Sequence, residues 1–590
     1  MPPRLADRAI SASGLLRRAK SPLQGLPMPV PTLVLNFGHS VLRSLSDYTD
    51  AASEIYRHYR MGQNIVAVTS AQGDQTDVLL AEARRIGPEG MSDGGGASNL
   101  PELLQLGERR SAALLALALE RIGAPAFVRQ ARDLGLTAMG DPMNAELTGL
   151  NSGQLMQDLK DHDIVVMPGF VAIGDKDRAV LLGQGGSDLT ALYVADQLGA
   201  PALLLKDVDG VYDRDPKERS DAPLRRYERV SYADVRRKAG PLIASRALDY
   251  AEGVGQRFRI GTPGSAISTQ VGDVSDPPVA ASRPRKLRIA MMGLGIVGGG
   301  VWRRVADHAD RFEIVRVMVR SPEKYIDQGY PEAILTTDAA DLFAAEPDIF
   351  IDVSGPIEPA LGLTRDMLSR GVHVVSANKQ AIAAGGQDLL DHSAASQARL
   401  LFSSAAGGGM PVLEMCLRER GRIARVEALL NGTTNFMLGE MDGGMSYADA
   451  LQIAQDRGYA EADPTADVDG HDAAAKIRLV SLLGFGKQIS PNQIERDTLA
   501  LVDARKKPGT VLKRVARVSA DTGELIADLR LRALSPNNFL AKADGEDAHA
   551  VFDFTDGDRY VIRGKGAGRW PTTEAVLADL YDLSNETGPA

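Results

Sequence analysis

The sequence predicts an α/β protein made of two halves. Apolar runs of strand length alternate with longer helical patterns, and a proline-rich segment without periodicity divides the chain near its middle. With 590 residues and about 150 residues per domain, the chain has room for three or four domains. Its 44% hydrophobic and 24% charged residues are typical of a globular protein, which excludes mainly disordered and collagen-like classes.

Charge and cysteine content narrow the function classes further. The 77 acidic and 67 basic residues give a formal charge of -10, which disfavours nucleic acid as a partner. The single cysteine, Cys416, excludes a disulfide framework and a zinc site of several thiolates, and fits a reducing, cytoplasmic compartment. The best apolar run, residues 112–119, is far shorter than the roughly 20 residues of a membrane span, so no membrane partner is expected.

Residues 1–30 are expected to be a disordered extension. The segment before Val34 carries five basic residues against one acid, Asp7, and such a composition is also typical of an organelle transit peptide. A third interpretation makes Met28 the true initiator, because the first strand-like run, residues 31–37, follows at once.

The first half, residues 31–270, has the rhythm of an α/β unit. Helical patterns such as residues 103–121 separate four strand-like runs, at residues 33–37, 65–69, 164–167 and 202–205. Residues 271–285 contain Pro277, Pro278 and Pro284 and are predicted to be an extended linker. The alternation resumes at residue 287.

A nucleotide-binding motif opens the second half. An apolar strand at residues 287–292 leads into Gly293, Gly295 and Gly298 in the spacing GxGxxG, and a helical pattern follows. The first glycine permits a tight turn, the second lets the backbone approach a pyrophosphate, and the third allows the helix to pack closely on the strand. The pyrophosphate would lie at the helix N-terminus, which favours anions. The motif predicts a Rossmann domain that binds NAD(P).

The end of the next strand bears on the choice of cofactor. The strand-like run at residues 313–319 ends at Arg320, where an NAD-specific fold places an acid for the ribose hydroxyl. An arginine can accept a 2′-phosphate through two hydrogen bonds, and Lys324 is near enough to help. We expect NADP; a solvated arginine and use of NAD is the alternative.

An acidic block precedes a lysine further along the chain. Asp472 and Lys476 are four residues apart, which places them on one face of a helix. A calcium loop is excluded, because Thr465 occupies its first position and Lys476 stands where a bidentate glutamate belongs. From the spacing alone, a surface ion pair would be the favoured interpretation.

From residue 286 to residue 587 the chain resembles homoserine dehydrogenase. The resemblance rests on the glycine motif, Ala377-Asn378-Lys379, GGGMP at 407–411, GTTNF at 432–436, the block at 461–476, and GKGAGRWPTTEAV from residue 564. It implies NAD(P)H-dependent interconversion of L-aspartate 4-semialdehyde and L-homoserine, on the route to threonine and methionine. It also implies a cofactor domain at 286–410 completed by 562–590, a catalytic and dimerisation domain at 411–561, and a homodimer or homotetramer.

The resemblance assigns roles to individual residues. Lys476 would be the catalytic acid/base and Lys379 a second lysine in the site; an ammonium can stabilise the alkoxide that hydride transfer leaves and give it a proton. No metal is needed, because the nicotinamide carries the redox step. The substrate would contact Glu461, Asp467, Asp472, Gly432 and Thr433. The cofactor would contact Gly293, Gly295, Ile296, Val297, Gly298, Arg320, Lys324, Ser354, Asn378 and Gly566.

One position departs from the homoserine dehydrogenase pattern. The family often has a glutamate before the GGGMP run that, with nearby carbonyls, holds a monovalent cation, and Ser403 stands there in this chain. A neutral hydroxyl is a poorer cation ligand than a carboxylate. Dependence on sodium or potassium is therefore in doubt.

Residues 31–270 resemble the amino-acid kinase fold, and most closely aspartokinase. The matching segments are LVLNFGHSVLRS, VTSAQGDQTDVLL, LGERRSAALLALAL, GQGGSDLTAL and KDVDGVYDRDPK. The resemblance implies a three-layer α/β/α domain that binds ATP or an amino acid. It places the ligand site at Asn36, Glu108, Gly185, Gly186, Ser187, Asp188, Asp209 and Tyr212.

The kinase-like half lacks charges that the family uses. Asn36 and Pro241 stand at lysine positions and Gln184 at an arginine position, whereas phosphoryl transfer depends on positive charge that compensates the triphosphate. We expect a degenerate kinase domain that binds a ligand or only assembles. The alternative is a bifunctional aspartokinase/homoserine dehydrogenase in which Lys206 and Lys217 supply the charge.

Regulation is also constrained. Only the linker separates the halves, where familiar bifunctional enzymes carry ACT domains, so threonine feedback through such domains is not expected. A protein whose halves only bind ligands is a third possibility, against which the set Lys379, Glu461, Asp472 and Lys476 argues.

Overall fold

The computed structural model describes residues 31–86, 99–218, 222–281, 285–499, 502, 507–520 and 523–586. The predicted N-terminal extension, residues 1–30, lies outside this described part. So do residues 587–590, the end of the segment predicted to complete the cofactor domain. From Pro31 onward the chain forms one compact unit. Among the described residues, no helix combines the length and apolarity needed to cross a membrane.

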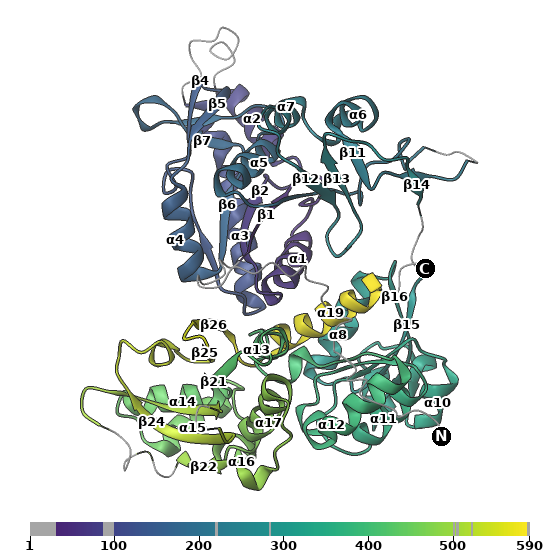
Figure 1. Cartoon of the computed structure of the whole chain (residues 1–590), viewed down its shortest axis with the longest axis vertical. Coiled ribbons are helices and arrows are strands. Elements are labelled where there is room, and N and C mark those ends of the chain that lie inside the picture. The colour runs from purple at the N-terminus through teal and green to yellow at the C-terminus, as the bar shows by residue number, and fades with distance from the viewer. Residues whose placement is uncertain are drawn as a thin grey trace, which may run out of the picture. The chain divides into compact units, whose positions relative to one another are not determined.

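The N-terminal half is built on an eight-stranded sheet with the order β11-β13-β12-β9-β1-β2-β6-β3 (Figure 1). The four strand-like runs of the sequence form adjacent parallel strands at its centre. These are β1 (Thr32–Phe37), β2 (Asn64–Thr69), β6 (Ile164–Pro168) and β9 (Ala202–Leu205). The outer strands are β3 (Ala126–Val128), β11 (Arg229–Ser231), β12 (Phe258–Gly261) and β13 (Ser268–Gly272).

Alternate side chains of β1 face two separate apolar cores. Val34 packs with residues of α4, α5 and α7 on one face, and Leu33 and Leu35 pack with α1 and α3 on the other. The alternation of one residue in, one residue out therefore produces the predicted three-layer α/β/α architecture. The helices are α1 (Asp47–Arg60), α2 (Gln75–Ile86), α3 (Leu100–Arg121), α4 (Ser152–His162), α5 (Gly186–Leu198), α6 (Tyr232–Lys238) and α7 (Ser245–Gly253).

Two small sheets complete this half. One contains β4 (Thr137–Asp141), β5 (Asn144–Gly149), β7 (Val171–Ile173) and β8 (Ala179–Leu181). The other pairs β10 (Arg225–Arg226) with β14 (Val279–Ala280). Within the predicted linker, residues 271–272 end β13 and residues 279–280 form β14, whose backbone pairs with β10 of the kinase-like half. Residues 282–284 lie outside the described part, and the linker as a domain boundary stays a prediction.

The second half begins with a parallel six-stranded sheet of the order β17-β16-β15-β18-β19-β20. Its strands are β15 (Leu287–Met292), β16 (Phe312–Met318), β17 (Leu335–Thr336), β18 (Ile349–Asp352), β19 (His373–Ser376) and β20 (Leu400–Leu401). Its helices are α8 (Ile296–Asp307), α9 (Pro322–Ile326), α10 (Ala339–Ala344), α11 (Ala360–Ser369) and α12 (Lys379–Ser396). The C-terminal helix α19 (Arg569–Glu586) packs on α8, and its Val576 and Leu580 join the core beneath the sheet.

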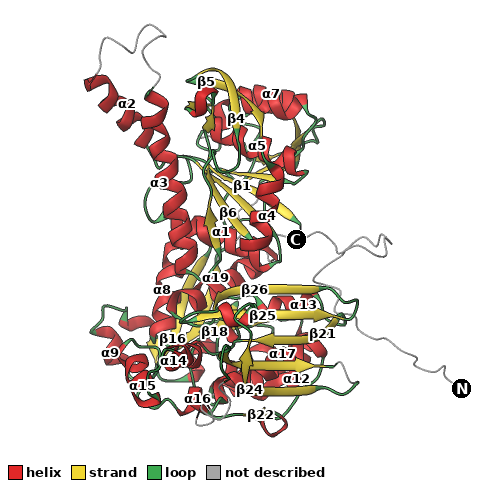
Figure 2. Cartoon of the chain, turned by 90° about the vertical axis from the view of Figure 1, so that its left-hand side faces the viewer, coloured by secondary structure: helices red, strands yellow, loops and turns green. Residues whose placement is uncertain are grey.

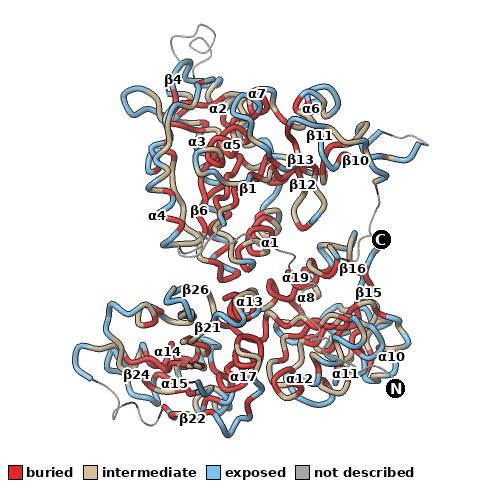
Figure 3. The backbone as a smooth tube through the Cα atoms, viewed as in Figure 1, coloured by how far each residue is buried: buried red, intermediate tan, exposed pale blue. Residues whose placement is uncertain are grey.

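The remaining part is an α+β domain around a second six-stranded sheet, whose strands lie side by side in Figure 2. Its strands are β21 (Ile423–Ala428), β22 (Glu495–Arg496), β23 (Val511–Ser519), β24 (Ile526–Leu534), β25 (Asp547–Phe554) and β26 (Arg559–Lys565). Its helices are α13 (Val412–Arg418), α14 (Gly432–Asp442), α15 (Tyr447–Asp456), α16 (Thr465–Val468) and α17 (His471–Phe485). Helix α17 is almost wholly buried (Figure 3) and packs against α12 and α13, which brings the catalytic and cofactor parts together.

Candidate active site and cofactor cavity

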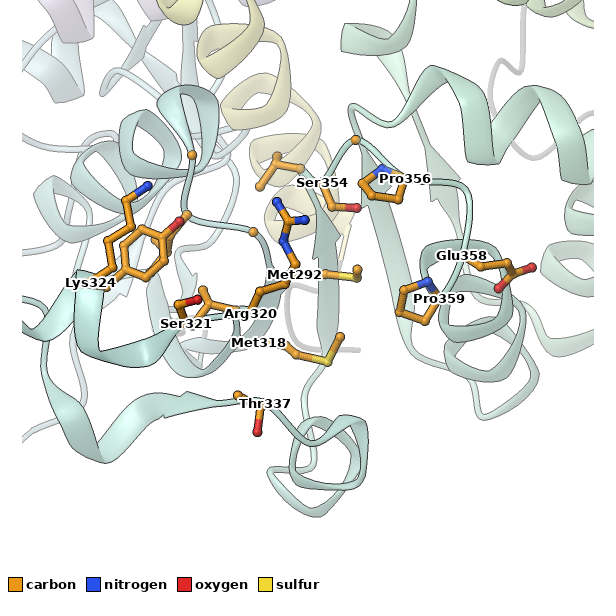
Figure 4. Close-up of a pocket in the computed structure, with 17 residues that line it drawn as sticks. Met292, Met318, Arg320, Ser321, Lys324, Thr337, Ser354, Pro356, Glu358 and Pro359 are labelled. Carbon is orange, nitrogen blue, oxygen red and sulfur yellow. The ribbon is translucent and has the colours of Figure 1, made fainter.

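A cavity of about 900 Å³ lies at the carboxyl ends of β15, β16 and β18. Ligands of open parallel sheets bind at this edge, where the strand order reverses. Figure 4 shows its lining, with Arg320 and Lys324 on one side and Ser354, Pro356 and Glu358 on the other.

The first two glycines of the motif, Gly293 and Gly295, line the cavity. Gly293 has a φ of +100°, which side chains disfavour. A Cβ on Gly298 would lie 2.4 Å from the carbonyl oxygen of Gly293, whereas a Cβ on Gly295 would meet nothing within 4 Å. Gly295 lines the cavity and caps the N-terminus of α8. The three positions thus have the geometry of a turn, a close backbone approach and a helix contact, which fits a pyrophosphate.

Two cations line the cavity beyond the end of β16. Arg320 follows β16, and Figure 4 shows its guanidinium directed into the space between Lys324 and Ser354. The ammonium of Lys324 lies 5.5 Å from the ring centre of Tyr325. Both side chains line the cavity, so they fit the phosphate of a dinucleotide.

Not every predicted cofactor residue lines this cavity. Ser354 does, and its hydroxyl donates to Asp352 and accepts from the amide of Asn378. Asn378 is buried and also donates to the carbonyl of Pro356, 2.8 Å away. Five predicted cofactor residues lie outside the lining: Ile296, Val297, Gly298, Asn378 and Gly566.

A lysine pair shares one carboxylate beside the cavity. Asp472 Oδ2 lies 2.8 Å from the Nζ of Lys476, and Asp472 Oδ1 lies 2.9 Å from the Nζ of Lys379. Lys379 begins α12, directly after Asn378, so the cluster stands at the cavity's edge. The ammonium of Lys476 also donates to the carbonyl of Leu430 at 2.7 Å. The alternative of a surface ion pair is therefore ruled out, because Asp472 and Lys476 are both buried.

Electrostatics hold this cluster in its charged form. Burial alone would raise the pKa of Asp472, but attraction by Lys476 and Lys379 outweighs it and holds that pKa well below the usual range. Attraction by Asp472 in turn raises the pKa of Lys379. The site therefore contains a carboxylate fixed between two ammonium groups.

Asn431 organises the cluster and was missed from the sequence. Its amide donates to Asp467 at 2.6 Å and to Asp472 at 3.1 Å. Its side-chain oxygen accepts from the backbone N–H of Thr434 and caps α14. An asparagine directly before Gly432 is a helix-capping signal in the sequence, but its contact with the carboxylates depends on tertiary packing.

The other predicted substrate residues surround this cluster less tightly. Asp467 is held by Asn431, and burial raises its pKa. Thr433 donates its hydroxyl to the carbonyl of Tyr459 at 2.7 Å, and Gly432 is the first residue of α14. Glu461 lies exposed on the loop before α16. Its charge also raises the pKa of Lys379, but less than the charges of Asp472 and Asp467 do.

In the kinase-like half, Asp188 lies between a neutral amide and a lysine. Asn36 Nδ2 donates to Asp188 Oδ1 at 2.6 Å, and the Nζ of Lys206 lies 2.8 Å from both carboxylate oxygens. All three side chains are buried. Lys206, at the end of β9, therefore places a cation beside the strand position where the aspartokinase pattern has its lysine and this chain has Asn36.

A cavity of about 350 Å³ opens beside Lys206. Arg214, Lys217 and Lys238 also line it, together with His39 and Tyr212. Tyr212 donates to Asp209, which does not line the cavity. Asp207 and Asp215 are the acids of the lining, and Asp207 Oδ2 lies 3.2 Å from the Nζ of Lys217. The lining still carries more cations than acids, which fits an anionic ligand.

Glu108 and the glycine turn stand apart from that cavity. Burial raises the pKa of Glu108 to about 7, and its Oε2 has no hydrogen-bond partner among the described residues. Gly185 has a φ of +72° and caps α5, which begins at Gly186. The hydroxyl of Ser187 lies 2.6 Å from that of Ser70. Gln184 is exposed, and Pro241 lies in the short turn Gly240–Leu242.

The fold and the two cavities define a nicotinamide-dependent oxidoreductase joined to a domain of the amino-acid kinase type. Three family models match the chain: the amino acid kinase family at residues 31–255, the NAD-binding domain of homoserine dehydrogenase at 293–403, and homoserine dehydrogenase at 411–581. The protein belongs to the homoserine dehydrogenase family, and it is an NAD(P)-dependent homoserine dehydrogenase.

Relatives of known name agree with this assignment. The homoserine dehydrogenase of Synechocystis is 32% identical over 329 residues, which is 52% of this chain and 76% of the relative. That of Bacillus subtilis is 30% identical over 316 residues, covering 50% of this chain and 72% of the relative. A solved homoserine dehydrogenase from Thiobacillus denitrificans is 31% identical, with a TM-score of 0.47, and the match covers 51% of this chain and 74% of that one.

Proposed function

We propose that the chain reduces L-aspartate 4-semialdehyde to L-homoserine with NADPH, and that Lys476 is the catalytic acid. The observation that carries the proposal is the carboxylate of Asp472 held between Lys476 and Lys379 at the edge of the dinucleotide cavity. When bound, the nicotinamide supplies the hydride. The residues of this chain must then bind the aldehyde, stabilise the charge on its oxygen and deliver a proton.

Lys476 is well placed for proton delivery. The carbonyl of Leu430 and Asp472 occupy two of the three N–H groups of its ammonium. The third is free to point at a substrate oxygen, so the ammonium can stabilise the growing alkoxide and protonate it. Lys379, 35% exposed, adds a second positive charge on the other oxygen of Asp472.

Asp472 then has a different role from the substrate contact expected from the sequence. Its two oxygens are engaged by both lysines and by Asn431. We therefore assign Asp472 to the orientation of the lysines. Asp467 and Glu461 remain to hold the amino group of the substrate by charge-assisted hydrogen bonds.

Arg320 and Lys324 support NADPH as the preferred cofactor. Both cations line the cavity beyond β16, where the 2′-phosphate of NADP would need positive charge.

For the kinase-like half we propose ligand binding without phosphoryl transfer. With Asn36 on β1, the buried charges facing each other are those of Lys206 and Asp188, and this pair is neutral overall. The bifunctional alternative is favoured by one observation: Lys206, Lys217 and Lys238 line the cavity and could supply positive charge for a triphosphate.

The dehydrogenase proposal is tested by the fall in NADPH absorbance after L-aspartate 4-semialdehyde is added to the full chain, with the product identified by chromatography. L-Homoserine as the product supports the proposal, and any other product overturns it. Assembly through the sheet that contains β21 to β26 stays a prediction.

A further inference from the structure

One side chain of the kinase-like half is buried among carboxyl groups of the dehydrogenase half. Arg60, the last residue of α1, is 2% exposed. Its Nη1 lies 2.7 Å from Asp579 Oδ1 and its Nη2 lies 2.5 Å from Asp582 Oδ2, both on α19. Glu414 Oε1, on α13, is 3.7 Å from Nη1. We call Asp579, Asp582 and Glu414 the acidic pocket.

The acidic pocket has little other compensation for its charge. Among the described residues, the ion pairs of all three carboxyl groups are with Arg60. Burial raises the pKa of Asp579, and it raises the pKa of Glu414 to about 7. Removing the partner of a buried charge destabilises a fold far more than the pair stabilises it. The dehydrogenase half is therefore built around a cation that it does not itself contribute.

Neighbouring contacts close the pocket from both sides. Arg304 of α8 donates to Asp50 at 2.8 Å and to Ser53 at 3.2 Å, both on α1. Tyr59 donates to the carbonyl of Arg563 at 3.0 Å. The guanidinium of Arg121 lies 3.8 Å from the ring centre of Trp570. Ion pairs thus cross in both directions, from α1 to α19 and from α8 to α1.

A series of hydrogen bonds links Asp579 of the acidic pocket to the segment that precedes Lys379. Asp579 accepts from the hydroxyl of Ser403 at 2.7 Å and from its backbone N–H at 3.2 Å. Ser404 donates to the carbonyl of Ser376 at 3.4 Å, and the hydroxyl of Ser376 accepts from the N–H of Asn378. Asn378 immediately precedes Lys379.

A second route runs through Glu414. It lies on α13, which packs against α17, the helix that carries Asp472 and Lys476. Lys379 on α12 and Lys476 on α17 are therefore both linked, through these contacts, to carboxyl groups that pair with Arg60.

The same position bears on the monovalent cation. Ser403 is the residue that replaces the family's glutamate ligand, and Arg60 Nη1 lies 3.3 Å from its hydroxyl. That hydroxyl already donates to Asp579, and a metal cation beside it would face a buried guanidinium of like charge. The residues present do not fit a monovalent cation here.

We propose that Arg60 is a built-in cation, supplied by the kinase-like half, that completes and positions the dehydrogenase half. The kinase-like half is then needed for dehydrogenase turnover whether or not it phosphorylates anything. Arg60 is a positioning residue, since it touches neither the cavity nor the lysines. The inference rests on the proposed function for its kinetic readout, and on the acidic pocket alone for its stability readout.

The test uses the full chain with Arg60→Met, Arg60→Lys and Arg60→Ala. Arg57→Met is the matched control, because Arg57 lies one turn earlier on α1 and pairs with Glu54 inside the kinase-like half. We expect Arg60→Met to lower kcat with aspartate semialdehyde by about tenfold or more, since misplaced catalytic groups lose rate steeply, with the KM for NADPH unchanged. Arg60→Lys should keep part of the activity, and Arg57→Met should keep the wild-type kcat.

Chemical rescue separates a cation requirement from general damage. Millimolar guanidinium chloride should raise both the Tm and the kcat of Arg60→Ala, whereas sodium or potassium chloride should not. Wild-type kcat in Arg60→Met, an equal loss in Arg57→Met, or rescue by potassium as good as by guanidinium would each overturn the proposal.

Two further measurements keep the outcome decisive. If Arg60→Met does not accumulate as folded protein, the double variant Arg60→Met/Asp579→Asn, which removes one charge of each sign, replaces it; we expect it to fold with a reduced kcat, and a wild-type kcat would overturn the proposal. If the wild-type chain does not reduce aspartate semialdehyde, the proposed function fails, and the guanidinium-dependent Tm of Arg60→Ala still decides the role of Arg60.

Discussion

Asp472 and Lys476 form a buried ion pair one helical turn apart on α17, with Oδ2 and Nζ separated by 2.8 Å. The pair is not isolated, because the second carboxylate oxygen holds Lys379 from α12. A single carboxylate thus sets the position of two ammonium groups that come from different parts of the dehydrogenase half.

Replacing this carboxylate should disable both lysines. We expect Asp472→Asn to lower kcat by about 100-fold, since the lysines lose the charge that orients them, while NADPH binding is retained. Attraction by Asp472 raises the pKa of Lys379, so this pKa should fall in the variant. The alkaline limb of the kcat–pH profile should therefore shift to lower pH. Asp463→Asn, in the exposed loop of the same block, is the control and should match the wild type in both respects.

Arg320 should determine the preference between NADPH and NADH. We expect Arg320→Ala to raise the KM for NADPH by about tenfold, the scale of one charge-assisted contact with phosphate, and to leave the KM for NADH unchanged. Steady-state kinetics with both cofactors measure the ratio. Equal increases for the two cofactors would mean that Arg320 contacts something other than the 2′-phosphate.

Much of this cofactor site could be predicted from the sequence, because its residues lie on consecutive elements. The GxGxxG spacing between a strand and a helix already specifies the turn at Gly293 and the open approach at Gly295. The cluster of Asp472, Lys476 and Lys379 was harder to predict from the sequence pattern alone. Spacing placed Asp472 and Lys476 on one helical face but could not distinguish a buried pair from a surface one, since periodicity describes a single element.

Contacts between distant elements were not predictable in this way. Asn431 reaches Asp467 and Asp472, and the carbonyl of Leu430 reaches Lys476, although these groups lie at least 36 residues apart in the sequence. Arg60 was not singled out from the sequence, yet it is buried and pairs with Asp579 of α19. Such contacts depend on how helices and strands pack against one another, and the residue pattern within one element does not predict them.

The kinase-like half should release no ADP in response to aspartate. In a coupled assay with MgATP, we expect the same background rate with and without L-aspartate, because Asn36 stands where the resemblance to aspartokinase implies a lysine and phosphoryl transfer depends on such charges. A working aspartokinase should serve as the positive control in the same buffer. Aspartate-dependent turnover by this chain would establish the bifunctional alternative, with Lys206 as the compensating cation.

Glu108 should make the stability of the protein fall as pH rises. Burial raises its pKa from 4.5 to about 7 in the folded state, so the folded protein holds a proton that the unfolded chain has released between these values. The resulting penalty is absent below pH 4.5, grows as pH rises, and is complete above about pH 7. Glu108→Gln should therefore be more stable than the wild type at pH 8, by up to about 3 kcal/mol, and similar to it at pH 4. Urea unfolding at both pH values measures the difference, and a variant that is less stable at pH 8 would contradict this account of Glu108.

The central claim is that Lys476 delivers the proton in the reduction of aspartate semialdehyde, and it is tested most directly by Lys476→Ala in the full chain. NADPH oxidation with L-aspartate 4-semialdehyde is followed in wild type and variant, alongside a fluorescence titration with NADPH. The account predicts a loss of about 1000-fold in kcat, the scale of a positioned general acid, with the affinity for NADPH unchanged. A variant that turns over within a few-fold of the wild type would contradict it.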